Sequence, residues 1–155
     1  MTSCTRPEME SDQLLLEQQL CFPLYAASRQ LIRRYRPHLE ALDLTYTQYI
    51  TMLVLWEEQH VSVKTLGQRL YLDSGTLTPL LKQLERKGYL RRFRSREDER
   101  VLLVELTEAG RALRERAKPI PALVGSCLPL EPEETAELYR LLYRLLHTDP
   151  EQNQT

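Results

Sequence analysis

The stretch from Tyr71 to Gly88, YLDSGTLTPLLKQLERKG, constrains the fold of this chain more than any other segment. Its large apolar residues recur at the spacing of one helical face; they are Leu77, Leu80, Leu81 and Leu84. The opposite face carries small residues, hydroxyls, one amide and two cations. Asp73 or Ser74 suits the N-cap, and Gly88 suits a left-handed turn at the end. The pattern predicts an amphipathic helix whose outer face has no bulky apolar group.

Pro79 falls in the second turn of this predicted helix. A proline there removes one backbone N–H and crowds the carbonyl of Gly75, which is a local cost to stability. Such a cost indicates that the exposed face serves a purpose other than folding.

Two β-like runs follow this helix directly. Residues 89–93 (YLRRF) and 101–106 (VLLVEL) are joined by a polar loop at 94–100 (RSREDER). Upstream, Ser62 is placed to cap a helix over residues 63–70, and the turn at 71–73 completes a helix-turn-helix. A basic hairpin after a helix-turn-helix predicts a winged helix. In that fold the second helix enters the major groove of DNA, and the hairpin, or wing, reaches the neighbouring backbone or minor groove.

The distribution of charge agrees with DNA binding, although the formal net charge of −1 does not decide it. Between Lys82 and Arg100, eight Lys and Arg residues stand against four Asp and Glu residues. Phosphate binding requires such local positive charge, and a solvated charged surface is the alternative. The candidate DNA contacts are Ser74, Gly75, Thr76, Thr78, Pro79, Lys82, Gln83, Arg86, Arg91, Arg92, Arg94, Arg96 and Arg100. Asp98 has the spacing to pair with Arg100 and to shape the wing.

The segment before the helix-turn-helix is expected to be helical. Pro23 either kinks one long helix or occupies the first position of a new helix that ends near Tyr35. Residues 36–38 (RPH) indicate a break before a short helix through Leu42. Thr45 and Gln48 have the spacing of a capping box, which opens a helix that ends in a polar turn at residues 57–60.

The segment after the wing is also expected to be helical. Thr107 is placed to cap a helix over residues 108–118, which Pro119 and Pro121 interrupt. A further turn or two is expected at 122–128. Pro132 fits the first position of a last helix with a broad leucine stripe. The chain is therefore predicted to be mostly α with a small β wing.

The two ends carry more apolar helix face than a small winged domain needs. We interpret the excess as the interface of a homodimer that reads a palindromic DNA site, and packing within one chain is the alternative. The expected organisation is a flexible tail at 1–12 and one domain at 13–148. Within it, the DNA-binding winged helix spans about 45–110, and the dimerisation helices span 13–42 and 111–148.

Composition narrows the class of protein. A hydrophobic content of 42% and a charged content of 28% are ordinary for a globular protein. No apolar run approaches a membrane helix and the start lacks a signal-peptide core, so we expect a cytoplasmic protein without membrane association. The three cysteines, Cys4, Cys21 and Cys127, lack zinc-binding spacing, and we expect no metal and no cofactor.

Several motifs resemble the MarR family of dimeric winged-helix repressors over roughly residues 14–146. The motifs that match the family are LDSGTLTPLL at 72–81, DER at 98–100 and LTExG at 106–110. The runs QLCFxLY at 19–25 and LTYxQY at 44–49 are similar to the organic-hydroperoxide sensors within that family. That branch more often has proline where this chain has Thr47, and an apolar residue where it has Pro23.

The resemblance implies roles for the matching residues. Cys21 would be the thiolate that peroxide oxidises, and Tyr35 and Tyr46 would hydrogen-bond it from the partner subunit. Tyr25 belongs to the same motif and joins the candidate redox site. Cys127 would be the resolving cysteine of the two-cysteine members. From the residues alone, Cys21 and Cys127 are equally compatible with packing as small apolar groups.

The sequence therefore favours a repressor that releases its DNA operator when an organic hydroperoxide oxidises Cys21. One rival is a MarR-type regulator that binds a small phenolic or apolar ligand, with Cys21 only packing. A second is a thiol peroxidase, which would leave the basic wing unexplained. A third is a regulator with the same sensor and broader operators.

Overall fold

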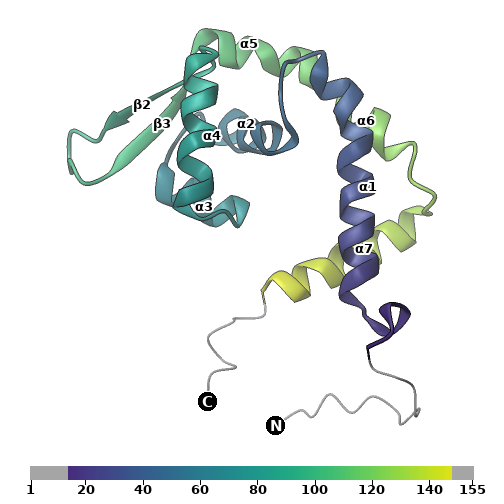
Figure 1. Cartoon of the computed structure of the whole chain (residues 1–155). Coiled ribbons are helices and arrows are strands. Elements are labelled where there is room, and N and C mark those ends of the chain that lie inside the picture. The colour runs from purple at the N-terminus through teal and green to yellow at the C-terminus, as the bar shows by residue number, and fades with distance from the viewer. Residues whose placement is uncertain (1–13, 148–155) are drawn as a thin grey trace, which may run out of the picture. The chain divides into compact units, whose positions relative to one another are not determined.

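The computed structural model describes residues 14–147 (Figure 1). The tail expected at residues 1–12, and Cys4 within it, lie outside this range. The described chain divides into two compact units, of which the first ends at Ile120 and the second begins at Pro121. The elements of the first unit are a 3-10 turn η1 (Leu16–Gln18), α1 (Cys21–Glu40), α2 (Tyr46–Glu58), β1 (His60–Ser62), α3 (Val63–Leu70), α4 (Ser74–Arg86), β2 (Leu90–Arg94), β3 (Leu102–Leu106) and α5 (Glu108–Ala117). The helices α6 (Ile120–Gly125) and α7 (Pro132–Leu146) follow.

Helix α1 runs without interruption through both of its prolines. Pro23 is the third helical residue, where a backbone N–H has no partner within the helix, so it lies in the first turn without kinking the helix. The helix begins two residues before Pro23 and ends at Glu40, beyond the end expected near Tyr35. The break predicted at residues 36–38 is wrong, because α1 continues through Pro37 to Glu40. Burial of Leu39, which is 2% exposed, and an Arg36–Glu40 ion pair of 2.8 Å support the last turn despite the missing hydrogen bond.

Side chains cap four helices at the predicted positions. Thr45 and Gln48 form the reciprocal capping box of α2. Ser62 caps α3 by accepting from the Thr65 N–H, and Thr107 caps α5 by accepting from the Gly110 N–H. Of the two candidates for α4, Asp73 is the cap. Local hydrogen bonding thus fixes where the winged-helix elements begin.

A three-stranded antiparallel sheet carries the wing, in the order β1-β3-β2. Strands β2 and β3 pair from Leu90 opposite Leu106 to Arg94 opposite Leu102, and their hairpin extends beyond α4 in Figure 1. The sequence analysis missed β1 and assigned His60 to a turn. In the structure, residues 60–62 pair with the other edge of β3, and only Val61 of this short strand is buried. Three residues are too few to show an alternating pattern.

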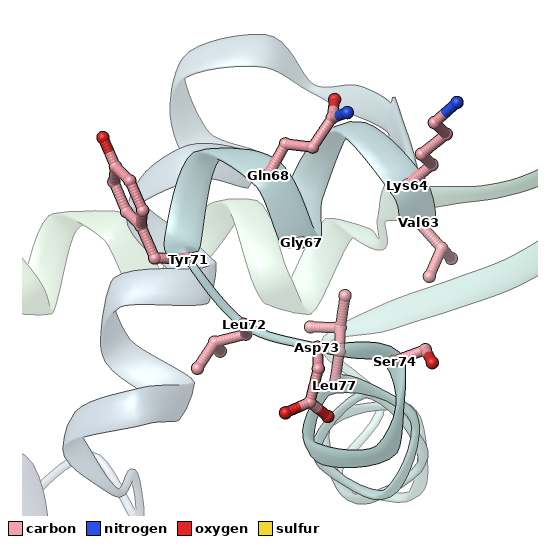
Figure 2. Close-up of a pocket in the computed structure, with 9 residues that line it drawn as sticks. All are labelled: Val63, Lys64, Gly67, Gln68, Tyr71, Leu72, Asp73, Ser74 and Leu77. Carbon is pink, nitrogen blue, oxygen red and sulfur yellow. The ribbon is translucent and has the colours of Figure 1, made fainter. Parts of the chain in front are cut away.

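The helix-turn-helix depends on a close approach between α3 and the turn before α4 (Figure 2). A Cβ added at Gly67 would lie 2.9 Å from the carbonyl oxygen of Leu72 and 3.5 Å from the Leu77 side chain. Tyr71, the C-cap of α3, has a left-handed backbone with φ of 54°, which turns the chain sharply. These two features set the position of α4.

The wing is anchored to the core through Gly110 in the first turn of α5. A Cβ at Gly110 would lie 2.0 Å from the carbonyl oxygen of Tyr89, so only glycine fits there without movement of the backbone. The indole N–H of Trp56 donates to the Gly110 carbonyl at 2.8 Å. The hydroxyl of Thr107 donates to the Gly88 carbonyl at 2.5 Å. Gly88 has φ of 78° and provides the predicted left-handed turn after α4.

Candidate DNA interface and redox site

The recognition helix α4 buries its leucines and exposes its polar face. Leu77, Leu81 and Leu84 are at most 1% exposed. The predicted contacts on the exposed face are Ser74, Gly75, Thr76, Thr78, Pro79, Lys82 and Arg86. Asp73 accepts from the Thr76 N–H at 2.8 Å, and this bond, followed by one from the Thr76 hydroxyl, lowers the pKa of Asp73. The charged cap therefore holds the first turn of the helix in place.

The side chain of Gln83, another predicted DNA contact on α4, forms a hydrogen bond with a different helix. Its Oε1 accepts from the Nε2 of Gln48 at 2.9 Å. Gln48 lies on α2 and is only 2% exposed. Gln83 thus links the recognition helix to α2. No sequence pattern indicates this contact, because the two residues are 35 positions apart.

Two of the predicted wing cations form ion pairs next to the sheet. Arg91 donates through Nε to Glu105 at 2.8 Å, across the β2–β3 ladder. Arg92 donates through Nη2 to Glu85 on α4 at 2.6 Å, and its side chain is 19% exposed. The hydrogen bonds from Arg92 are the main cause of the lowered pKa of Glu85. Arg92 therefore connects the wing to the recognition helix and is poorly placed to bind phosphate.

Polar contacts shape the loop at the tip of the wing. Asp98 Oδ1 accepts from the Arg100 backbone N–H at 3.0 Å and from its Nε at 3.1 Å, which confirms the predicted pairing. Arg94 donates to the carbonyl of Glu99 at 3.2 Å. Arg94 and Arg100 thus contribute to the shape of the loop as well as to its charge.

Three predicted DNA-contacting cations are exposed and make neither an ion pair nor a side-chain hydrogen bond within the described residues 14–147: Lys82, Arg86 and Arg96. The first two lie on the outer face of α4, and Arg96 lies in the wing loop. A cation without an intramolecular partner keeps its full charge for phosphate.

Cys21 is the first residue of α1, and its thiol is exposed and in no disulfide. Tyr25 follows one turn later. The Tyr25 hydroxyl accepts from Arg29 Nη1 at 3.0 Å, and the Arg29 guanidinium lies 5.4 Å from the centre of the tyrosine ring.

Tyr35 and Tyr46, the two predicted partners of Cys21, lie in a cluster with Tyr49. The ring centres of Tyr35 and Tyr46 are 5.1 Å apart, and those of Tyr35 and Tyr49 are 5.7 Å apart. Burial raises the pKa of Tyr35 and of Tyr46, and it raises the pKa of Tyr49 to about 12. All three phenols stay protonated at neutral pH and keep an O–H that can donate. Sequence analysis missed Tyr49, although it lies one turn from Tyr46.

A cleft of 420 Å³ opens beside Tyr46, between α1 and the start of α2. Apolar side chains and two arginines line it together with a threonine and a glutamate: Ile32, Leu39, Leu44, Tyr46, Arg33, Arg36, Thr45 and Glu40. Of the three tyrosines, only Tyr46 is among the side chains that line this cleft.

Cys127 lies in the second unit, directly after α6, and is exposed. Its thiol donates to the carbonyl of Leu123 at 3.4 Å, and its backbone N–H donates to the carbonyl of Val124 at 3.1 Å.

Within residues 14–147, no group of three or more His, Cys, Asp or Glu side chains is arranged to hold a metal ion. In the same range, no helix combines the length and apolar character needed to cross a membrane.

Comparison with known proteins identifies the family. The family model for the transcriptional regulators SarA/Rot matches residues 33–116. The organic hydroperoxide resistance transcriptional regulator of Bacillus subtilis is 46% identical over 146 residues, which cover 94% of this chain and 99% of that protein. The chain belongs to this family of winged-helix regulators, the MarR family, and to its organic hydroperoxide resistance branch. Its relatives are DNA-binding transcriptional regulators, and the chain is not an enzyme.

Solved structures of MarR-family proteins support the same assignment. Reduced AbfR bound to DNA is 37% identical, with a TM-score of 0.70 over 84% of this chain and 91% of that one. AbfR, from Staphylococcus epidermidis, is also known in an overoxidised state bound to DNA and in a disulfide-formed state. A mutant of Escherichia coli MarR complexed with operator DNA is 25% identical, with a TM-score of 0.73 over 82% of this chain and 93% of that one.

Proposed function

We propose that this MarR-family regulator is a homodimeric repressor that leaves a palindromic operator when an organic hydroperoxide oxidises Cys21. The observation that carries the proposal is an exposed thiol at the first residue of α1, in a chain 46% identical to an organic hydroperoxide resistance regulator. A helix N-terminus favours the negative charge of a thiolate, which is the form that reacts with peroxide.

DNA recognition falls to α4 and the wing. The small and polar face of α4 fits the major groove, with Lys82 and Arg86 beside the phosphates. Arg96 is the wing residue best placed to reach the neighbouring phosphates or minor groove. The DNA-bound state of the 37% identical AbfR supports this arrangement.

The homodimer is supported by the exposed apolar residues of α1. Leu24 is 44% exposed, Phe22 and Ile32 are also exposed, and Leu20, the N-cap residue just before α1, is 71% exposed. Leu39 is the only buried residue of this 20-residue helix. A row of large apolar side chains without cover marks an association surface, and a second copy of this chain is the partner that a palindromic operator requires.

The geometry of α1 supports a redox site shared between subunits. Cys21 and Tyr35 lie on the same helix, and at 1.5 Å per residue the backbone rises about 21 Å between them. Tyr46 packs edge-on against Tyr35, so it too is remote from Cys21 of its own chain. The two phenols can therefore donate to a Cys21 thiolate only from the partner subunit.

The proposed chemistry proceeds in two balanced steps. The Cys21 thiolate attacks one peroxide oxygen, the O–O bond breaks, and the products are a sulfenic acid and the alcohol, which takes up a proton. The thiolate of Cys127 from the other subunit then attacks the sulfenic sulfur, forming a disulfide and releasing water or hydroxide. Two cysteines are oxidised and one hydroperoxide is reduced.

The disulfide, rather than the added oxygen, is proposed as the step that releases DNA. AbfR is bound to DNA in both its reduced and its overoxidised states. A disulfide requires its two Cα atoms to lie within about 7 Å, so closing it constrains the helices that carry the cysteines. That constraint changes the spacing of the two recognition helices.

A non-reducing gel tests the chemistry. Treatment with an organic hydroperoxide should convert the wild-type protein to a covalent dimer, and a reductant should return it to the monomer on the gel. Cys127→Ser should remain a monomer on the gel yet form a sulfenic acid at Cys21. Cys21→Ser should form neither the covalent dimer nor a sulfenic acid at position 21. A covalent dimer in the Cys127→Ser protein would exclude Cys127 as the resolving residue.

A further inference from the structure

Gln48 is a buried amide that the proposed function does not use. It is 2% exposed, and Gln48 and Thr51 are the buried polar side chains among residues 14–147. Burial of an amide is costly unless its donors and acceptors find partners, so the partners of Gln48 show what it holds together.

The Gln48 side chain connects three elements. Its Oε1 accepts from the backbone N–H of Thr45 at 3.1 Å, in the capping box of α2. The same oxygen accepts from Lys87 Nζ at 3.2 Å, at the C-cap of α4. Its Nε2 donates to Gln83 Oε1 on the recognition helix at 2.9 Å. One side chain therefore ties the first turn of α2 to two positions on or next to α4.

Lys87 reinforces this connection from the other side. Its Nζ also donates to the carbonyl of Asp43 and lies 3.2 Å from the Asp43 carboxylate, at the turn between α1 and α2. The end of α4 is thus held against the segment from Asp43 to Gln48 by the hydrogen bonds that Lys87 donates and by the one that Gln83 accepts.

The first turn of α2 also carries the tyrosines of the redox site. Tyr46 precedes Gln48 by two residues, Tyr49 follows it directly, and both rings contact Tyr35 of α1. Movement of Tyr46 must shift the backbone of this turn or rotate its side chain. A shift of the turn displaces Gln48 together with its partner on α4.

We propose that Gln48 is a positioning residue that fixes the recognition helix against the tyrosine-bearing turn of α2 and passes movement of that turn to the DNA-binding face. The positioning role stands on the hydrogen bonds alone. The transmission of an oxidation signal rests on the proposed function as well.

A double-mutant cycle separates this role from helix capping. Gln48→Met keeps the length of the side chain and removes all of the hydrogen bonds that the side chain makes. Thr45→Ala is the matched control, because it damages the same capping box and leaves the bond from Gln48 to Gln83. Gln83→Met and the double variant complete the cycle. Thermal unfolding, operator affinity and the rate of sulfenic acid formation at Cys21 are measured for each protein.

Gln48→Met should weaken operator binding by the reduced protein about tenfold more than Thr45→Ala does at similar thermal stability. In the Gln83→Met background, the effect of Gln48→Met should fall to about twofold, because the contact is already lost. The rate of Cys21 oxidation should stay within about twofold of the wild-type rate, and the loss of affinity on oxidation should be smaller than in the wild-type protein.

An equal effect of Gln48→Met in both backgrounds, or an effect no larger than that of Thr45→Ala, would overturn the proposal. Should Gln48→Met fail to fold, Gln48→Glu replaces it in the same cycle, since it retains the oxygens for Thr45 and Lys87 and lacks the amide donor. If wild-type protein keeps its operator after oxidation, the proposed function fails, and the cycle in the reduced state still decides whether Gln48 positions α4.

Discussion

The winged helix and helix α1 differ in where their apolar side chains go. In the winged helix, Leu66, Leu84 and Val104 are completely buried within the chain. In α1, Phe22, Leu24 and Ile32 are exposed, and Leu39 is the only buried residue of that helix. The winged helix thus holds a core of its own, whereas α1 leaves an apolar face exposed, which we propose is the dimer interface. Substitutions should accordingly unfold the first region and dissociate the second.

The largest effect is expected at Gly110, where the wing meets the core. Gly110→Ala places a Cβ 2.0 Å from the carbonyl oxygen of Tyr89, so the backbone must move. We expect a loss of about 3 kcal/mol in the free energy of unfolding, measured by denaturant titration. Gly125→Ala is the control, since a Cβ there meets nothing within 4 Å. Equal stability of the Gly110→Ala and wild-type proteins would contradict the packing described here.

The two phenylalanines of the chain provide a matched pair for the second prediction. Phe22 in α1 is 42% exposed and Phe93 in the wing is 36% exposed. Phe22→Glu should weaken the dimer by about 2 kcal/mol because it buries a charge at the interface. Phe93→Glu should leave the dimer intact. Sedimentation over a range of concentrations measures both, and a stable Phe22→Glu dimer would show that α1 is not the interface.

The wing cations should differ from one another in their contribution to DNA binding. Arg96→Ala should lower the slope of log affinity against log salt concentration by about 2, because it removes one phosphate contact from each subunit of the proposed dimer. Arg92→Ala should leave that slope nearly unchanged, since Arg92 is paired with Glu85. Operator titrations at several salt concentrations make the comparison, and equal slopes for the two variants would remove the distinction.

The smallest effect is expected at Asp98. Asp98→Ala removes the hydrogen bonds to Arg100 within an exposed loop. Operator affinity should fall about threefold and the unfolding midpoint should not change, because exposed ion pairs add little to stability. A large drop in thermal stability would mean that the wing loop is part of the core.

The sequence was most informative where local chemistry determines structure. The caps at Thr45, Ser62 and Thr107, the buried leucines of α4 and the β2–β3 hairpin were all predicted, because each follows from a short pattern. The family was also predicted correctly from its motifs.

Contacts between distant residues escaped the sequence analysis. The capping box predicted Gln48 as a local partner of Thr45 and gave no sign of its bond to Gln83. Arg92 was predicted as a DNA contact from its place in a basic segment. Its ion pair with Glu85 could not be inferred, because Glu85 lies on a different element. Pro37 was taken as a helix end, since the pattern did not reveal that tertiary burial of Leu39 keeps the helix intact.

The role of Cys21 is tested most directly by titrating operator DNA with the reduced protein, again after an organic hydroperoxide, and again after a thiol reductant. We predict tight binding, then release, then recovery, while Cys21→Ser binds equally well under all three conditions. Loss of operator binding by the Cys21→Ser protein after the same hydroperoxide treatment would contradict the account. Retention of the operator by fully oxidised wild-type protein would contradict it as well.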